Sequence, residues 1–530
     1  MVVILPVASC DTDELHNRNI NPQAGPTAPM EFLFTAAQLS TASGGAGGDN
    51  RYIDWRTNIG FCAYAVQQLA NATLAGISPG DKYFDNGESY SAPWEFIYGD
   101  QLKNLAEVIR QTSPGGFAEG KDNLRNAARI LRVYNFHRLT DYYGNIPYFD
   151  ALKGLDLLYL PEYDKQQAIY LDMLNELDQA TPALTPITTT AANDISFAAA
   201  DLFYAGDIAK WKKFGYSLML RLAMRISNVD AANANKYVAK AVAGGVFANN
   251  GDNLWVGMAV GPSQWTNQNG ISRAFIAGDG AQPSTLSKTL VDQLMGANKG
   301  STADDDPRLM IFSGGYGDHT DPLEQRGLPN GLDQAMVNTL VGVTGDDDVN
   351  IGATFSQLND TLIHEDAPYL LMSYSEAAFL LAEAGEKGIG GVSAAGAQAN
   401  YENGVRAAIK MYSPFDTKDH AFDITDAEVD NYLAARPYPT AGTLENKMEA
   451  IGTQLWLCKF MSWWEAWADW RRIGYPKLTP TNYSGNVTNG TIPRKLRLPN
   501  QEVASNQANY AAGATKPDTP IGRVWWDGGN

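Results

Sequence analysis

The histidines of this sequence, the side chains best suited to acid–base catalysis and metal binding at neutral pH, are scattered along the chain. None of them stands in the HExxH spacing that places two ring nitrogens on one face of a helix; they are His16, His137, His319, His364 and His420. The sequence also has no GxSxG nucleophile motif and no glycine loop typical of phosphate binding. We therefore expect no catalytic residue and no cofactor. A carboxylate pair that meets only in the folded chain, as in a glycoside hydrolase, remains the alternative.

Two acidic runs, Asp304–Asp306 and Asp346–Asp348, offer the oxygen ligands that Ca²⁺ prefers. Neither has the spacing of an EF-hand loop. Asp306 stands two residues before Arg308, so we expect its carboxylate to cap the following turn or to pair with that arginine. The other run lies in GDDDVN, which is typical of a solvated loop. We predict no metal site, and a structural Ca²⁺ stays open.

Aromatic side chains on predicted loops suit a different chemistry, the binding of a sugar. One face of a sugar ring carries C–H groups that an aromatic ring covers, and its edge carries hydroxyls that amide, carboxylate or guanidinium groups bind. Such rings occur in the predicted loop 76–91 and in the glycine-, asparagine- and aspartate-rich region 244–360; they are Tyr83, Phe84, Tyr90, Trp255, Trp265 and Tyr316. Asn267, Gln268 and Arg273 are the polar neighbours of Trp265. For each ring the alternative is packing beneath its own loop.

Composition and charge narrow the class of ligand. The chain has 530 residues, 44% of them hydrophobic, which is typical of a globular protein with a large core. Its net charge of -19 works against nucleic acid and anionic membrane surfaces as ligands, and it leaves neutral ligands open. Three cysteines are too few for a disulfide scaffold or a cysteine-rich metal site. Cys62 and Cys458 lie in apolar helical contexts, where we expect buried, inert thiols.

Cys10 differs from the other two cysteines. It ends a short apolar run, Val7-Ala8-Ser9-Cys10, that resembles the lipobox at which a bacterial lipoprotein signal is cut and its cysteine acylated. Acidic residues follow directly, as in the signal that sends such lipoproteins to the outer face of the cell. We predict a lipid anchor on Cys10, with an ordinary buried N-terminus as the alternative. No later segment has the uncharged apolar length of a membrane span.

The elements that must position these residues are mainly helices, because apolar residues recur at helical spacing along most of the chain. The segments with this spacing are Phe32–Ser40, Tyr52–Leu74, Trp94–Gln111, Lys121–Leu139, Tyr163–Leu177, Tyr204–Ile226, Ala232–Ala243, Tyr369–Ala384, Tyr401–Met411, Asp426–Leu433 and Met448–Tyr475. The pairs within 94–139, 163–226 and 369–411 look like tetratricopeptide hairpins that stack, although the strict 34-residue period is missing. Strand signals are sparse, so the predicted fold class is mainly α.

The segment Met448–Tyr475 concentrates six large rings in one predicted helix; they are Trp456, Phe460, Trp463, Trp464, Trp467 and Trp470. At helical spacing these rings form one broad face, which we interpret as buried core rather than as a platform for a glycan. Glu465, Asp469, Arg471 and Arg472 are expected towards the rim of that face.

The predicted organisation is one large domain whose parts differ in composition and in predicted secondary structure. A lipoprotein signal remnant (1–9) and a polar tether (10–30) precede a helical part (31–243). A loop-rich region (244–360) and a second helical part (361–475) follow. A turn-rich tail (476–530) is expected to pack on the body.

Several ordered segments together resemble the SusD/RagB-like outer-membrane lipoproteins of Gram-negative bacteria. They are FHRLTDYYGNIPYFDAL, WKKFGYSLMLRLAMRIS, DDPRL, APYLLMSYSEAAFLLAEA, IPRKLRLPNQEVASN and the closing VWWD. The resemblance covers essentially the whole chain. It implies a helical body with tetratricopeptide-like pairs that sits as a lid on a TonB-dependent transporter barrel and captures an oligosaccharide or polysaccharide, or in some members a peptide.

The resemblance also implies where the ligand binds. The family builds its ligand face from an early loop and the middle region, so we predict a site that includes Tyr83, Trp255, Trp265, Asn267, Arg273 and Tyr316. The partners implied are a glycan, the transporter barrel, and the outer membrane through the lipid on Cys10. Nucleic acid is not expected as a partner.

Overall fold

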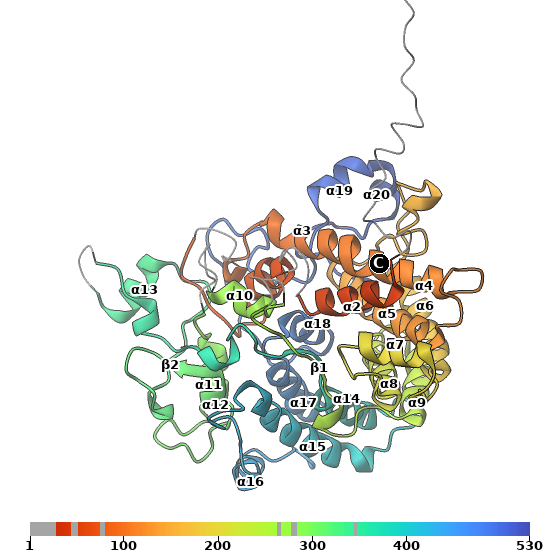
Figure 1. Ribbon diagram of the computed structural model, residues 1–530. Helices are drawn as coiled ribbons and strands as arrows, with labels where there is room; N and C mark the ends of the chain where they lie inside the picture. Colours follow the sequence, from red (N-terminus) through yellow and green to blue (C-terminus); the bar gives the residue numbers. More distant parts are fainter. Residues whose placement is uncertain are drawn as a thin grey trace, which may run out of the picture.

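The fold of the protein is mainly α, as predicted, in a computed structural model that describes residues 28–43, 51–74, 80–261, 267–276, 284–343 and 347–529 (Figure 1). Cys10, the predicted signal remnant and Trp265 lie outside the described residues. No helix in the described part is both long enough and apolar enough to cross a membrane.

The α-helices fall into three groups along the chain. The N-terminal group contains α2 (Met30–Thr41), α3 (Gly87–Phe96), α4 (Lys103–Thr112), α5 (Asp122–Tyr143), α6 (Gln166–Ala183), α7 (Ala192–Ala200), α8 (Ile208–Arg225) and α9 (Ala231–Gly244). The middle group contains the short α10 (Gly270–Ile276), α11 (Lys288–Leu294), α12 (Leu309–Phe312) and α13 (Gln334–Val341). The C-terminal group contains α14 (Tyr374–Lys387), α15 (Ala397–Lys410), α16 (Asp426–Ala435), α17 (Leu444–Cys458), α18 (Trp463–Ile473), α19 (Asn500–Ser505) and α20 (Gln507–Gly513).

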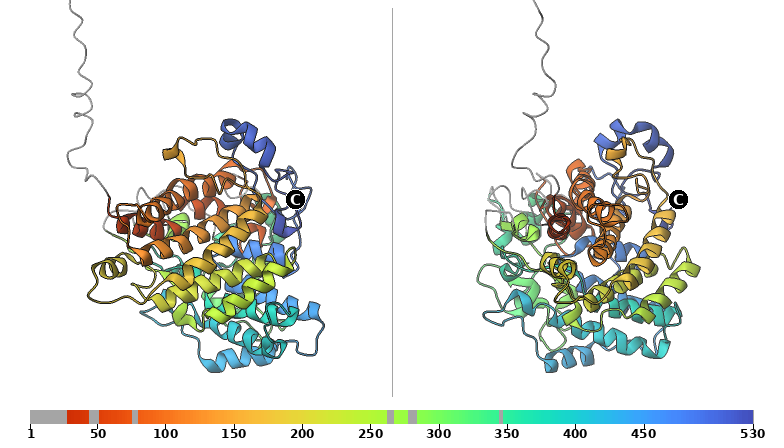
Figure 2. Two further views of the ribbon diagram at one scale, coloured as in Figure 1. Left: turned by 90° about the vertical axis from the view of Figure 1, so that its right-hand side faces the viewer. Right: turned by 45° about the vertical axis from the view of Figure 1, so that its right-hand side comes forward.

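Successive helices of the N-terminal group pack side by side, which confirms the predicted stack of helix pairs (Figure 2). α5 packs against α4 and α6, α8 packs against α6 and α9, and α14 packs against α15. Glycines allow two of these pairs to cross closely. A methyl group on Gly215 would lie 2.3 Å from the Thr181 hydroxyl, and one on Gly404 would lie 2.6 Å from the Phe379 ring. Any larger residue at either position would push the paired helices apart.

Two small antiparallel sheets interrupt the helices. Strand β1 (Leu254–Val256) pairs with β4 (Tyr369–Met372), and β2 (Ser313–Gly315) pairs with β3 (Gln357–Leu358). The prediction of one helix over Tyr369–Ala384 is therefore wrong in its first five residues, because α14 begins only at Tyr374. The Ser373 hydroxyl accepts a hydrogen bond from Glu376 N (3.3 Å) and caps α14, so the chain before Ser373 is free to pair with β1.

The tryptophan-rich segment forms two helices rather than one, because α17 ends at Cys458 and α18 begins at Trp463. The side chain of Asn58 bridges the break. Its amide nitrogen donates to Met461 O (3.0 Å), and its amide oxygen accepts from Trp464 N (2.9 Å). Asn58 thus satisfies backbone groups that a continuous helix would satisfy by itself. All six rings are buried, so the prediction that this segment is core is confirmed.

The prediction for the charged residues of the same segment is wrong. Glu465, Asp469, Arg471 and Arg472 were expected at the rim, yet all four are buried. α18 is covered by other helices whose own charged side chains face it, which sequence spacing within one helix cannot reveal. Ion pairs link these helices: Arg225 with Glu465 and Asp141, Arg221 with Glu376, Lys459 with Asp469, and Arg472 with Glu383.

We expect Trp467→Ala to lower the free energy of unfolding by about 3–5 kcal/mol, because it removes a fully buried ring and leaves a cavity. The ring also donates to Pro493 O (2.9 Å) and stacks beneath the Arg471 guanidinium (3.6 Å to the ring centre). Urea unfolding followed by fluorescence measures the loss. Trp525→Ala, at a half-buried ring, is the matched control and should cost less. Unchanged stability with lost ligand binding would place the ligand site on α18 instead.

The decrease in the free energy of unfolding at acid pH should depend on Glu383. Burial by itself raises the pKa of this carboxyl, but the Arg472 guanidinium and the Lys387 ammonium lower it to about 2, against an ordinary value of 4.5. Glu383 therefore stabilises the folded state above pH 4.5, and this contribution is lost as the pH falls from 4.5 towards 2. We expect Glu383→Gln to cost about 3–5 kcal/mol at pH 7, and the difference from wild type to shrink below pH 4.5.

Urea unfolding at pH 7, 4.5 and 3 measures this difference. Glu107→Gln is the control, because Glu107 forms an exposed pair with Arg110 (2.7 Å) that should contribute less than about 1 kcal/mol. A difference between Glu383→Gln and wild type that is the same at every pH would contradict the assignment.

Candidate functional site

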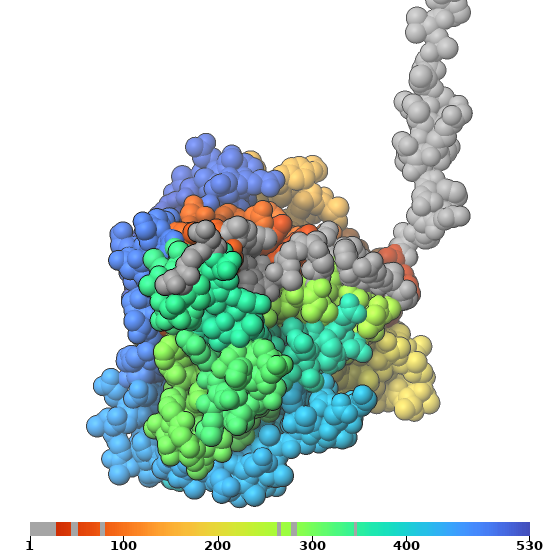
Figure 3. All heavy atoms as spheres, turned by 90° about the vertical axis from the view of Figure 1, so that its left-hand side faces the viewer, coloured from red at the N-terminus to blue at the C-terminus, as the bar shows by residue number. Residues whose placement is uncertain are grey.

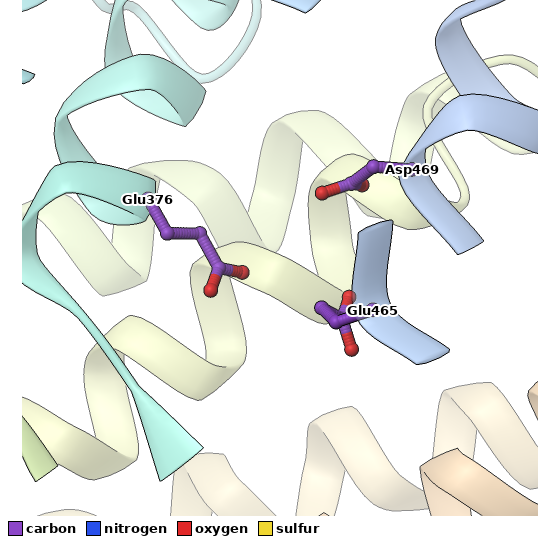
Figure 4. A group of neighbouring side chains, drawn as sticks. All are labelled: Glu376, Glu465 and Asp469. Atoms are coloured by element: carbon purple, nitrogen blue, oxygen red, sulfur yellow. The ribbon is translucent and has the colours of Figure 1, made fainter. Parts of the chain in front are cut away.

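Three carboxylates in the core have the spacing of a metal site. One oxygen each of Glu376, Glu465 and Asp469 lies within 4.8 Å of the others, from α14 and α18 (Figure 4). Cations of the chain already occupy the space between them: Lys459 reaches all three carboxylates, and Arg221 and Arg225 pair with two of them. The group is therefore a buried ion network that joins helices, and it leaves no charge for a metal ion to balance.

Other side chains of types that can catalyse reactions or bind metals have structural roles in this protein, as the carboxylates of the ion network do. His137 is buried with its Nδ1 2.6 Å from Tyr134 O, and burial lowers its pKa to about 3, so the ring is neutral at physiological pH. Cys62 and Cys458 are buried free thiols, as predicted, and burial raises the pKa of Cys458 to about 12. Asp306 accepts from the Arg308 guanidinium (2.7 and 2.9 Å), which confirms the predicted pairing.

One surface feature that could hold a ligand is a hollow of about 820 Å³ beside α13, a helix that lies on the face of the molecule shown in Figure 3. We name it the first hollow. Its lining combines an early segment of the chain with the middle region; the residues are Asn71, Ala72, Thr73, Leu74, Phe275, Ser284, Thr285, Asp333, Gln334, Ala335, Asp348, Ile351, Gly352 and Gln357. Amide, hydroxyl and carboxylate groups alternate with apolar ones, and none of these lining residues is a lysine or arginine. The hollow thus suits a neutral ligand rather than an anion.

Backbone hydrogen bonds between distant segments build the floor of the first hollow. Ala70 N donates to Thr285 O (3.0 Å), and Ser287 N donates to Gln68 O (3.1 Å). On the other side, Leu286 N donates to Ser356 O (2.8 Å). The chain around Leu286 is therefore paired on both sides, with the early segment and with the residues that precede β3. This irregular seam holds the two halves of the lining together.

The seam is attached to the tryptophan-rich core. The Trp456 indole donates to Val66 O (2.9 Å), and the Gln68 side-chain amide donates to Trp456 O (2.6 Å). Trp456 is almost fully buried, so these two bonds connect the floor of the hollow to the hydrophobic core. Binding surfaces held in this way lose little conformational freedom when a ligand binds.

The wall formed by α13 rests on a separate small core. This core contains Ala70, Ala72, Leu328, Val337 and Phe355. At the start of α13 the Asp333 carboxylate accepts from Met336 N (2.8 Å) and from the Tyr483 hydroxyl (2.7 Å). The pKa of Asp333 is lowered mainly by the hydrogen bond from Tyr483, and to a smaller extent by the hydrogen bond from the Met336 amide. The carboxylate is therefore charged at neutral pH and accepts hydrogen bonds only.

The polar side chains of the first hollow are held in place by hydrogen bonds. Gln357 Oε1 accepts from the hydroxyls of Ser284 (3.3 Å) and Thr285 (3.2 Å). The Gln334 amide donates to Asn338 Oδ1 (3.1 Å) and to Val349 O (3.0 Å). At the rim, Leu74 is half exposed and presents an apolar surface. Such a mixture of oriented polar groups and C–H surface matches what a sugar ring offers.

The structure places the predicted ligand residues in several different locations. Tyr83 and Arg273 are 2% exposed, so neither side chain is open to a ligand, and we do not retain them as ligand contacts. Trp255 is partly buried in β1 and packs edge-on against Phe415 (5.6 Å). Asn267 is partly exposed and its amide donates to Gly261 O (3.0 Å), while Trp265 lies outside the described residues.

Tyr316, the remaining predicted contact, stacks on His319 (4.7 Å between ring centres), and its hydroxyl donates to Glu324 O (3.0 Å). None of the described predicted contacts lines the first hollow. Sequence reasoning missed Leu74, Gln334 and Gln357, which do line it. Their residue types carry no distinctive signal, and only the seam brings their segments together. Phe275 is the aromatic residue of the middle region in this lining.

Comparison with known proteins gives one family and many solved structures of the same fold. A SusD-like family model, described as starch-binding and associating with the outer membrane, matches residues 24–499. A solved structure named chitin-binding protein is 32% identical with a TM-score of 0.77, over 94% of this chain and 100% of that chain. We found no match among curated proteins.

Two further solved structures are 24% identical to this chain, and they show the fold alone. One is a chitin-binding SusD homolog from Flavobacterium johnsoniae, with a TM-score of 0.71 over 94% of this chain and 98% of that chain. The other is a SusD homolog from Bacteroides uniformis, with a TM-score of 0.73 over 94% of this chain and 100% of that chain.

Proposed function

This chain belongs to the SusD-like family, as its sequence motifs predicted, and we propose that it captures a chitin-type polysaccharide for delivery to a transporter. Members of this family bind glycans, associate with the outer membrane and are not enzymes. The glycoside hydrolase alternative is therefore not retained. The proposal concerns three finer points, which are the glycan, the anchor and the partner.

We choose chitin because this chain is 32% identical to a solved structure named chitin-binding protein. The similarity extends over almost the whole of both chains. The chemistry of the first hollow supports the same choice. Chitin is an uncharged polymer of N-acetylglucosamine, so each unit offers hydroxyls, one amide and a C–H face. The described lining residues include no lysine or arginine; they offer amides and hydroxyls, with Leu74 at the edge, and so provide groups for each of these features.

Attachment to the membrane through lipid on Cys10 is the second point of the proposal. Between Cys10 and Ala28, the first described residue, eighteen peptide units can extend to about 60 Å at most. A tether of that reach allows the body to stand off the membrane, which suits a net charge of -19 beside an anionic surface.

A TonB-dependent transporter barrel is the proposed partner, and an exposed apolar segment of the body supports a protein partner. Residues 149–160 carry large apolar side chains that face solvent; they are Phe149, Leu155, Leu157, Leu158, Tyr159 and Leu160. Asn509 holds the end of this segment by donating to Leu160 O (2.9 Å). So many exposed apolar side chains in one short segment are rare on monomeric proteins and mark interaction sites. We name residues 149–160 the apolar segment.

We expect the purified chain to bind soluble chitin oligosaccharides in isothermal titration calorimetry. Leu74→Asp should weaken this binding at least about tenfold, because it puts a charge on the apolar rim of the first hollow. Leu444→Asp is the matched control, since Leu444 is equally exposed and an aspartate at the start of α17 is favourable for the helix. Binding of peptides but no glycan would instead support the peptide alternative for this family, and equal affinity of Leu74→Asp and wild type would move the site elsewhere.

We expect a tagged chain, expressed in its own host, to co-purify with a TonB-dependent barrel from outer membranes. Leu155→Asp in the apolar segment should reduce the recovered barrel several-fold, because a charge would be buried at the contact. Val242→Asp, at a single exposed apolar side chain on α9, should leave recovery unchanged. Recovery of the chain alone from the periplasm would contradict both the anchor and the partner.

A further inference from the structure

A second hollow, of about 680 Å³, lies on the other side of α13 from the first. Its lining residues are Gln67, Lys288, Thr289, Asp292, Pro329, Asn330, Gly331, Met336, Thr479, Pro480, Thr481, Asn482, Tyr483 and Ser484. Gln334 and Ala335 line the first hollow while Met336 lines the second, so α13 is the wall between them. Figure 3 shows this wall on the surface, in green, beside the blue chain of the C-terminal part.

A hydrogen-bonded pair joins the linings of the two hollows at the start of α13. The Tyr483 hydroxyl donates to Asp333 Oδ2 (2.7 Å), with Tyr483 in the second hollow and Asp333 in the first. The Tyr483 ring packs edge-on against Phe84 (5.6 Å) and is only partly buried. The two hollows are therefore neighbours on one face and share their rim.

The 479–484 segment, which forms the outer side of the second hollow, is held rigidly. The Gln67 amide donates to Thr479 O (2.5 Å), and the Thr481 hydroxyl donates to Asp81 O (2.5 Å). Gly331 has a positive φ of 80°, and a methyl group there would lie 2.7 Å from the Thr481 side chain. A side chain at position 331 would thus push the segment away. The shape of the hollow does not depend on a ligand to form it.

The lining of the second hollow also suits an uncharged, hydroxyl-rich ligand. Its one lysine, Lys288, pairs with its one acid, Asp292, so the lining carries no net charge. Asn482 and Ser484 are exposed and present an amide and a hydroxyl. Met336 is 46% exposed and presents a C–H and thioether surface. These are the group types found in the first hollow, and each hollow also has one aromatic ring in its lining, Phe275 in the first and Tyr483 in the second.

We propose that the second hollow is a further binding subsite for the same polysaccharide chain, so that one polymer crosses α13 and occupies both hollows. This inference rests on the proposed function. A polymer bound in the first hollow has to continue over neighbouring surface, and the second hollow is the adjoining concave surface with matching chemistry. Two weak contacts on one chain act together, so long chains gain affinity that short ones do not.

The dependence of affinity on chain length tests the inference. Calorimetry with the N-acetylglucosamine disaccharide and hexasaccharide should show tighter binding of the hexasaccharide to wild type. Met336→Asp, which adds a charge, and Ser484→Trp, which fills space, should each weaken hexasaccharide binding about tenfold and leave disaccharide binding unchanged. Leu340→Asp is the matched control, because Leu340 lies on the same helix with similar exposure (50%) and lines neither hollow. It should bind both lengths as wild type does.

Two results would overturn the inference while leaving the proposed function intact. Hexasaccharide affinity equal to wild type in both Met336→Asp and Ser484→Trp would exclude the second hollow as a subsite. Equal loss of both lengths in these variants would show that the second hollow is not a separate contact. A wild-type chain that binds neither length would overturn the proposed function, and the inference with it.

Discussion

The packing of this protein depends on pairing charges that are buried in its core. α18 carries Glu465 and Asp469 into the interior, and an unpaired carboxylate there would cost several kcal/mol. The cations that balance them come from elsewhere: Arg221 and Arg225 from α8, and Lys459 from the break before α18. Because each pair needs both helices in one position, the network determines which faces meet. Removing one partner of such a pair would leave an unpaired charge in the core, which is strongly destabilising.

The rigidity of this core extends to the ligand face through few contacts. Trp456 connects the core to the early segment through Val66 and Gln68, and that segment is paired with the chain around Leu286. The first hollow is thus formed by residues far apart in sequence but attached to one support. A binding protein benefits from this arrangement, because a neutral sugar offers only hydrogen bonds and C–H contacts, and neither compensates for ordering a flexible surface.

Local sequence signals predicted some elements well and failed where a distant side chain intervened. The helix pairs followed from apolar spacing, since that spacing marks one buried face of a helix wherever it packs. The break after Cys458 could not be predicted, because it depends on Asn58, about 400 positions earlier in the chain. Tyr369–Met372 has the apolar pattern of either a helix or a buried strand, and its pairing with β1 decided between them.

By itself the sequence determined the fold class, the family, the burial of the tryptophans and the pairing of Asp306 with Arg308. Each of these depends on patterns within one segment or on ordered motifs along the chain. Only the tertiary structure decided that Glu465, Asp469, Arg471 and Arg472 lie inside, that Tyr83 and Arg273 are buried, and that Leu74, Gln334 and Gln357 share one hollow. The physical reason is the same in each case. Spacing within a helix or loop predicts which side chains share a face, but whether that face meets solvent, ligand or another charged helix depends on segments that only folding brings together.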